Sequence, residues 1–260
     1  MATSAGTLPG AAPTTRRRLL TGNLVAGRVV ATFGTCAYAD LGGELVAVEA
    51  AGGLRLPCSV LLGLGDPARD ALAGLRPGAD AEAGDGSLRL GPLVVRVARW
   101  WRPAAPRGER PPAYDTADHL PGRWDELARP LLGLGPGLTP AGDDLLAGLL
   151  VGLAGRPDLR DPLADAVARL APARTTWLSA ELLRLAADGF AAPAVVTVAD
   201  ALAGHGPDDA LAGALPALLA VGHTSGAALA RGLLLAATTV AGDGRQMTRD
   251  RNHFTTWSAV

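Results

Sequence analysis

The chain has 260 residues, enough for one large domain or two small ones, and a formal net charge of −1. This charge gives no electrostatic reason to expect binding to nucleic acid or to an anionic membrane. All 24 basic residues are arginine, which excludes Schiff-base chemistry on a lysine and a P-loop lysine.

Export and membrane insertion are not expected. Three arginines at positions 16–18 precede two leucines, but neither a long apolar run nor a small-residue cleavage site follows. An uninterrupted apolar run of about 18 residues, as a membrane helix needs, does not occur. Cys36 and Cys58 lack the spacing of metal ligands and are expected to be buried free thiols. These features favour a cytoplasmic protein without a nucleic-acid or membrane partner.

The first part of the chain has the pattern of a β-domain. Residues 1–20 are rich in Ala, Thr, Gly and Pro and are expected to form a disordered tail. Residues 21–103 contain short runs with β-branched side chains, separated by Gly-Gly and Asp-Gly turns. This punctuation predicts a small antiparallel β-barrel or sandwich, with a short helix over residues 67–75. Trp100 and Trp101 end this part, and they are expected to cover a core edge or domain seam rather than stack on a ligand.

The second part is predicted to be helical, so the fold class is α+β. Residues 104–122, rich in Pro, Arg and Gly, predict a linker or an exposed loop, and residues 242–260 a loose tail. Between them, the period of the apolar residues predicts an α-helical bundle over residues 123–241. Gly213 and Gly232 fall inside expected helices and are predicted to allow close helix contacts. The expected helices span residues 124–132, 141–155, 161–170, 176–188, 193–204, 207–220 and 226–241.

The most informative stretch is GLGPGLTPAGDDLLAG at residues 133–148, a glycine-rich loop that runs into a helix. Gly135 and Gly137 let the backbone turn tightly and approach a ligand closely. Thr139 is a natural N-cap, and Pro140 stands where the first turn of a helix tolerates proline. The backbone N–H groups of such a helix start can hold a carboxylate or a phosphate.

Two acids, Asp143 and Asp144, lie within the first turn of this helix. The helix is otherwise apolar nearly all round and should be buried, so both carboxylates need partners. A metal, an arginine or the amide N–H₂ of a ligand would serve, and simple capping of the helix is an equally good reading.

Three segments resemble the small-subunit family of oxamate carbamoyltransferase, from the anaerobic breakdown of allantoin in purine catabolism. They are residues 133–148, RTTWLSAELLRLAADG at 174–189 and GHTSGAALARG at 222–232, and the resemblance runs from about residue 26 to about residue 241. It implies phosphorolysis of oxalurate to oxamate and carbamoyl phosphate, together with other subunits. It does not assign catalytic residues, and many members of the family are proteins of unknown function.

The same three segments are helix starts with clustered hydroxyl groups, and we expect them to converge on one site for a small anionic substrate. The substrate would be bound by Gly135, Gly137, Thr139, Arg174, Thr175, Thr176, Thr224 and Ser225. Asp143 and Asp144 are candidates to orient the carbamoyl N–H₂, and His223 is the best candidate for acid–base catalysis. No zinc-ligand pattern is present, and a magnesium ion held by aspartates is neither required nor excluded.

Two other functions remain open at this point. The chain could be a non-catalytic binding or assembly subunit of a multi-subunit complex, with the chemistry on a partner chain. It could also be a stand-alone hydrolase of small molecules that uses the two aspartates and a metal.

Overall fold

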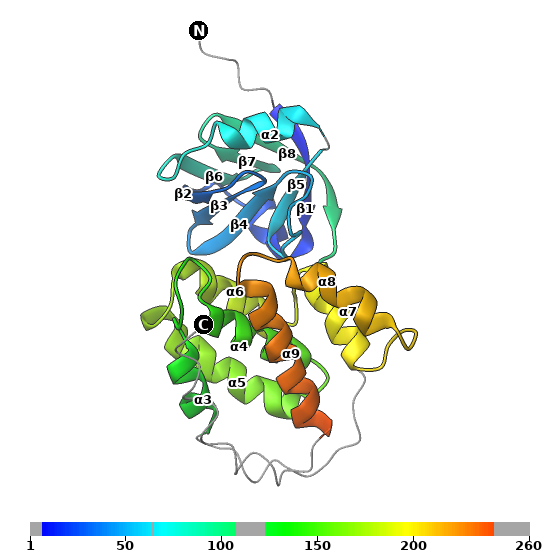
Figure 1. The fold of residues 1–260 in the computed structure, drawn as a ribbon. Helices are drawn as coiled ribbons and strands as arrows, with labels where there is room; N and C mark the ends of the chain where they lie inside the picture. Colours follow the sequence, from blue (N-terminus) through cyan, green and yellow to red (C-terminus); the bar gives the residue numbers. More distant parts are fainter. Residues whose placement is uncertain (1–6, 64, 108–122, 242–260) are drawn as a thin grey trace. The chain divides into compact units, whose positions relative to one another are not determined.

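A computed structural model describes residues 7–63, 65–107 and 123–241, which divide into two compact units (Figure 1). The first unit contains the described residues up to Ala105 together with Phe190–Val196. The second contains the remaining described residues. Most of the predicted linker, residues 108–122, and the predicted C-terminal tail lie outside the described residues.

The first unit is a closed β-barrel. Within the described residues its strands follow the order β1-β5-β4-β3-β2-β6-β7-β8, and β8 returns to pair with β1. Their bounds are β1 (Thr7–Pro13), β2 (Val25–Thr32), β3 (Cys36–Leu41), β4 (Glu44–Glu49), β5 (Ser59–Leu62), β6 (Asp80–Gly84), β7 (Ser87–Leu90) and β8 (Leu93–Trp101). A short helix, α2 (Asp66–Ala73), stands close to the helix predicted over residues 67–75.

The barrel is mixed rather than antiparallel. Most neighbouring strands are antiparallel, but β1 runs parallel to β8 and β4 runs parallel to β5. The predicted α+β class and barrel are confirmed, whereas the prediction of purely antiparallel pairing is wrong. Alternation of side chains shows that a segment is a strand, but the period is the same in parallel and antiparallel pairs.

The N-terminal segment is ordered where the sequence predicts a tail. β1 is followed by a 3₁₀ turn (Thr14–Arg16) and by α1 (Arg17–Thr21), so the prediction of disorder is wrong for residues 7–20. β1 contains two prolines, which makes it a poor strand by composition. Its register with β8 shifts between Gly10 and Ala11, next to Pro9, and such irregularities are where a sheet tolerates proline. Residues 1–6 lie outside the described residues.

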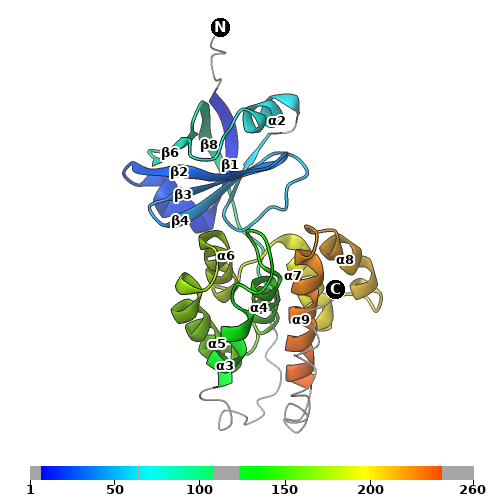
Figure 2. The ribbon, with the colours of Figure 1, turned by 60° about the vertical axis from the view of Figure 1, so that its left-hand side comes forward.

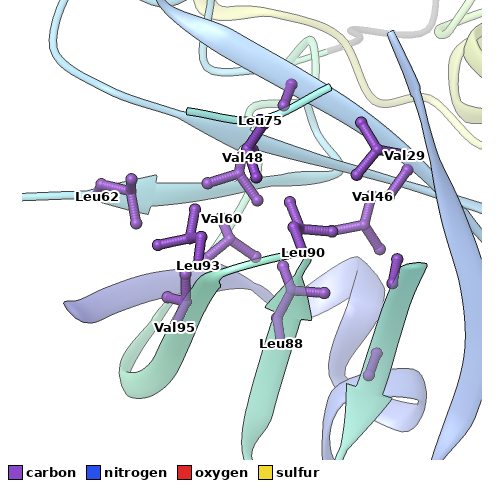
Figure 3. Close-up of a cluster of buried hydrophobic side chains, with 14 of the residues drawn as sticks. Val29, Val46, Val48, Val60, Leu62, Leu75, Leu88, Leu90, Leu93 and Val95 are labelled. Carbon is purple, nitrogen blue, oxygen red and sulfur yellow. The ribbon is translucent and has the colours of Figure 1, made fainter. Parts of the chain in front are cut away.

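Aliphatic side chains fill the barrel (Figure 3). The alternation is clear in β7, where Leu88 and Leu90 are buried and Arg89 between them is exposed. Leu75, which follows α2, joins the same cluster. Fourteen of the side chains are drawn, and those labelled are Val29, Val46, Val48, Val60, Leu62, Leu75, Leu88, Leu90, Leu93 and Val95.

The tryptophan pair and the cysteines belong to the barrel unit. Trp100 packs against the core cluster, with the guanidinium of Arg17 4.8 Å from its ring centre. The indole N–H of Trp101 donates to the carbonyl of Ser59 at 3.2 Å, so the pair covers a core edge. Cys36 and Cys58 are both free thiols, and only Cys58 is fully buried, which raises the pKa of its thiol to about 12.

The helices of the second part begin and end within a few residues of the predicted positions. They are α3 (Arg123–Leu131), α4 (Ala141–Gly152), α5 (Pro157–Leu170), α6 (Trp177–Ala187), α7 (Pro193–Leu202), α8 (Ala210–Leu219) and α9 (Ser225–Ala241), with a 3₁₀ turn at Ala171–Ala173. The first four residues of α7 are grouped with the barrel unit.

α4 and α9 lie side by side (Figures 1 and 2), and glycines at their contact let the two backbones approach closely. A Cβ at Gly148 would overlap the carbonyl of Leu229, and a Cβ at Gly232 would overlap the carbonyl of Leu145. Gly148 contacts Leu229, and four residues later a Cβ at Gly152 would meet the Cβ of Ala236, so the contacts advance along both helices in the same direction. α4 and α9 are therefore parallel, and their N-termini are neighbours. The predicted close contact at Gly232 is confirmed, whereas the one at Gly213 is wrong, since no atom lies within 4 Å of a Cβ built there.

Replacing Gly232 with alanine should destabilise the helical unit by about 1–3 kcal/mol, because backbone atoms of α4 would have to move. Gly213→Ala is the matched control, since the exposed Gly213 has free space and alanine is the better helix former by about 0.5–1 kcal/mol. Urea denaturation of both variants measures the two effects. Equal stabilities would contradict the glycine contact between α4 and α9.

Candidate functional site

The glycine loop between α3 and α4 has a backbone that requires glycine. Gly133, Gly135 and Gly137 have φ values of 76°, 115° and 94°, in a region that residues with a Cβ rarely adopt. Gly133 is also packed so closely that a Cβ would overlap the carbonyl of Arg174. The loop is therefore shaped by its glycines and fits directly against the segment that leads into α6.

α4 begins at Ala141, where the predicted helix begins, but its cap is not the predicted one. Pro140 is its N-cap, with an extended backbone, and its carbonyl accepts from the N–H groups of Asp143 and Asp144 at 3.0 and 3.1 Å. The prediction that Thr139 caps the helix is wrong, because this position lies outside the first turn. The Thr139 hydroxyl instead lies 3.3 Å from the Ser225 hydroxyl at the start of α9.

Asp143 joins the loop to two helices. Its side chain is buried, and its oxygens accept from the Gly133 N–H at 2.9 Å, from the Ser179 hydroxyl at 2.8 Å and from the Thr175 hydroxyl. Ser179 was not among the predicted site residues. It lies in the first turn of α6, four residues after Thr175, and its closeness to the hydroxyl cluster in the sequence was the available signal.

Asp144 has a different environment. It is 8% exposed, and its Oδ2 atom has no hydrogen-bond partner among the described residues. Burial raises the pKa of this carboxyl to about 6, a hydrogen bond with the Ser225 side chain opposes the shift, and the nearby charge of Asp143 adds to it. Asp144 therefore retains an unused acceptor in a nearly closed position.

Thr176 is the N-cap of α6. Its hydroxyl oxygen accepts from the Ser179 N–H at 3.0 Å, and its hydroxyl donates to the carbonyl of Leu138 in the glycine loop. Arg174 is exposed, and its Nη1 donates to the carbonyl of Arg129 at 3.2 Å. Thr175 and Thr176 thus fasten the loop, while Arg174 contacts the last turn of α3.

The start of α9 completes the arrangement. A Cβ at Gly226 would overlap the carbonyl of Leu218, so α9 follows α8 through a close turn. Ser225 then contacts both Thr139 and Asp144 of the α4 start. His223 and Thr224 are exposed, and the Thr224 carbonyl accepts from the Ala228 N–H at 3.1 Å. The three predicted helix starts are therefore neighbours, joined by Asp143 on one side and by Ser225 on the other.

The described residues contain neither a cluster of three or more metal-ligating side chains nor a helix suited to span a membrane. Among the described residues, no three or more His, Cys, Asp or Glu side chains form a cluster that could hold a metal ion. A magnesium ion held by the two aspartates alone stays a prediction. No helix in the described ranges is both long and apolar enough to cross a bilayer.

The fold and site define an α+β protein in which a glycine loop and three joined helix starts form the candidate site. The family model described as oxamate carbamoyltransferase subunit AllH matches residues 131–237, which include all three motifs. This match confirms the predicted family resemblance over the helical residues, and it does not include the barrel strands. No curated protein and no solved structure matches the chain.

Replacing Asp143 with asparagine should destabilise the helical unit by roughly 2–4 kcal/mol, because three donors would compete for one amide oxygen and the new N–H₂ would be buried. Asp161→Asn, an exposed change on α5, is the control. Thermal unfolding of both variants measures the difference. An Asp143→Asn protein that melts with the wild type would show that this carboxylate does not hold the loop.

Because of Asp144, the free energy of unfolding should decrease as the pH rises. The carboxyl has a pKa of about 6 in the folded chain, against an ordinary value of 3.8, so the folded state retains this proton up to a higher pH than the unfolded state does. As the pH rises from about 4 to about 6, the free energy of unfolding of the wild type should decrease by up to about 3 kcal/mol relative to that of Asp144→Asn. The difference should persist at higher pH. Urea denaturation of both proteins across this range is the measurement, and a pH-independent difference would contradict it.

Proposed function

We propose that this chain is a subunit of an oxamate carbamoyltransferase-like enzyme and that the joined starts of α4, α6 and α9 form its part of the substrate site. The family match over residues 131–237 supports the class of enzyme. The main support for this site is the state of Asp144. Its side chain lies at a helix start, the residue is 8% exposed, and one of its buried oxygens has no partner among the described residues. Buried polar atoms without a partner are costly, so their persistence is characteristic of functional sites.

The reaction would transfer the carbamoyl group from oxalurate to phosphate. A phosphate oxygen attacks the carbamoyl carbon, the bond from that carbon to the oxamate nitrogen breaks, and the nitrogen takes up a proton as oxamate leaves. Negative charge develops on the carbamoyl oxygen as the phosphate adds. Backbone N–H groups at helix starts can stabilise such charge because they are fixed in advance.

The candidate residues receive the following roles in this proposal. Asp144 accepts a hydrogen bond from the carbamoyl N–H₂ and so orients the group for attack. Gly135 and Gly137 leave the loop backbone open to a ligand, because a Cβ at Gly137 would meet no atom within 4 Å and Gly135 is exposed. His223, exposed just before α9, is the candidate to supply the proton of the leaving nitrogen.

The remaining candidates contribute less directly. Thr224 is proposed to contact the anionic part of the substrate, and Thr139 and Ser225 are proposed to border its N–H₂ end beside Asp144. Arg174 would have to leave the carbonyl of Arg129 in order to bind a carboxylate. No cysteine or serine with an adjacent histidine base is found among these candidates, so the proposal is a direct transfer without a covalent enzyme intermediate.

The assembly alternative has one observation in its favour. The glycine loop exposes Leu134 and Leu138, which are 55% and 40% accessible. Exposed leucines beside a candidate site are consistent with a partner subunit that contacts this loop. The two functions are compatible if the partner completes the site.

The proposed function predicts that the assembled complex forms carbamoyl phosphate from oxalurate and phosphate. Phosphorus NMR on the full chain co-purified with its partner subunits can follow this product. Asp144→Ala should lower turnover by about 10²-fold or more, as loss of a positioned group at the reacting centre does, while Asp161→Ala should not.

Co-purification with the partner subunits serves as the assembly control. Full turnover in Asp144→Ala with intact assembly would favour the non-catalytic alternative. A complex that assembles but forms no carbamoyl phosphate would contradict the proposed reaction.

A further inference from the structure

The two adjacent aspartates differ in how their oxygen atoms are used. We propose that Asp143 is a positioning residue and that, of the two aspartates, only Asp144 contacts the ligand, recognising the uncharged N–H₂ end of a carbamoyl or primary amide group. This inference rests on the site of the proposed function and narrows the chemistry of what binds there.

The oxygens of Asp143 are already engaged. They accept from one backbone N–H and two hydroxyl groups, which come from the glycine loop, the approach to α6 and the first turn of α6. A ligand that bound Asp143 would have to displace one of these donors and loosen the loop. Asp143 therefore acts on the ligand through the shape of the loop.

Asp144 has the complementary property. The Ser225 side chain lies beside the carboxyl and lowers its pKa, and Oδ2 is buried without a partner in the described chain. An acceptor that is buried and unused gains most from a donor supplied by a ligand. An ionised carboxylate supplies no such donor, and both carboxylate and phosphate would be repelled by an ionised Asp144.

The hydroxyl groups next to Asp144 select for the same kind of ligand. When Asp144 is ionised, the Ser225 hydroxyl must donate to it, because a carboxylate only accepts. The Thr139 hydroxyl, 3.3 Å away, is then left to donate to Ser225 and presents lone pairs to any further neighbour. The α4 start thus offers acceptors, which suits a group with two N–H bonds.

The glycine contact between α4 and α9 keeps this arrangement in place. Asp144, Gly148 and Gly152 follow one another at four-residue spacing on the face of α4 that meets α9. Ser225 can reach Asp144 because Gly148 and Gly232 let the two parallel helices approach. A bulkier contact would separate Ser225 from Asp144.

Calorimetry on the full chain at about pH 8, where the carboxyl is ionised, can test the inference with two probes, oxamate and N,N-dimethyloxamate. Both carry the same carboxylate, but only oxamate has N–H bonds. Oxamate should bind the wild type at least about tenfold more tightly. Asp144→Ala should remove this preference, whereas the exposed control Asp161→Ala should keep it.

A variant of the Asp143 cluster separates positioning from contact. Ser179→Ala removes one of the three donors to Asp143, and it should lower the melting temperature while the preference for oxamate is retained. Absence of oxamate binding to the wild type, equal binding of the two probes, or a preference that survives in Asp144→Ala would each overturn the inference. Because binding is measured without turnover, a failure of the transfer reaction leaves this test readable.

Discussion

The candidate site depends on one buried carboxylate. Asp143 accepts hydrogen bonds from the glycine loop and from two hydroxyls at the start of α6, and this fixes a loop whose glycines have left-handed backbones. Left-handed glycines are flexible in an unfolded chain, so the loop would be poorly defined without such an anchor. The carboxylate accepts from the Gly133 N–H of the loop. Asp144, the next residue, takes no part in this anchoring and is the residue that we propose binds the ligand.

The contrast between Asp143 and Asp144 separates a stabilising carboxylate from the one that we propose binds the ligand. Asp143 is fully satisfied, whereas Asp144 is nearly buried with an unpaired oxygen and a raised pKa. A protein selected for stability alone would gain by replacing Asp144 with a side chain that needs no partner. Its presence in the segment that matches the family model is what makes the α4 start a candidate site rather than a well-capped helix.

Periodicity and turn residues were enough to predict a β-barrel followed by helices, and the helix boundaries to within a few residues. They predicted the burial of α4 and the need of both aspartates for partners, but not which partner each would find. The contacts of Asp143 with Thr175 and Ser179 join residues 32 and 36 positions apart, and no local pattern encodes such a pairing. Thr139 illustrates the limit on a smaller scale, because the cap is Pro140, one residue further on, and the Thr139 hydroxyl lies beside Ser225 instead.

The parallel pairing of β1 with β8 has a consequence for how the barrel forms. β1 ends at Pro13, and β8 begins at Leu93, so the barrel closes by joining segments about 80 residues apart in the chain. During synthesis the first strand can meet only part of β5 until β8 has emerged, and until then the sheet has open edges. Closing so long a loop costs entropy before the contacts can offset it, which makes this step slow relative to formation of the hairpins. β1 contains two prolines and a glycine, which lower its β-propensity. This composition disfavours pairing of β1 with other chains before β8 has been synthesised.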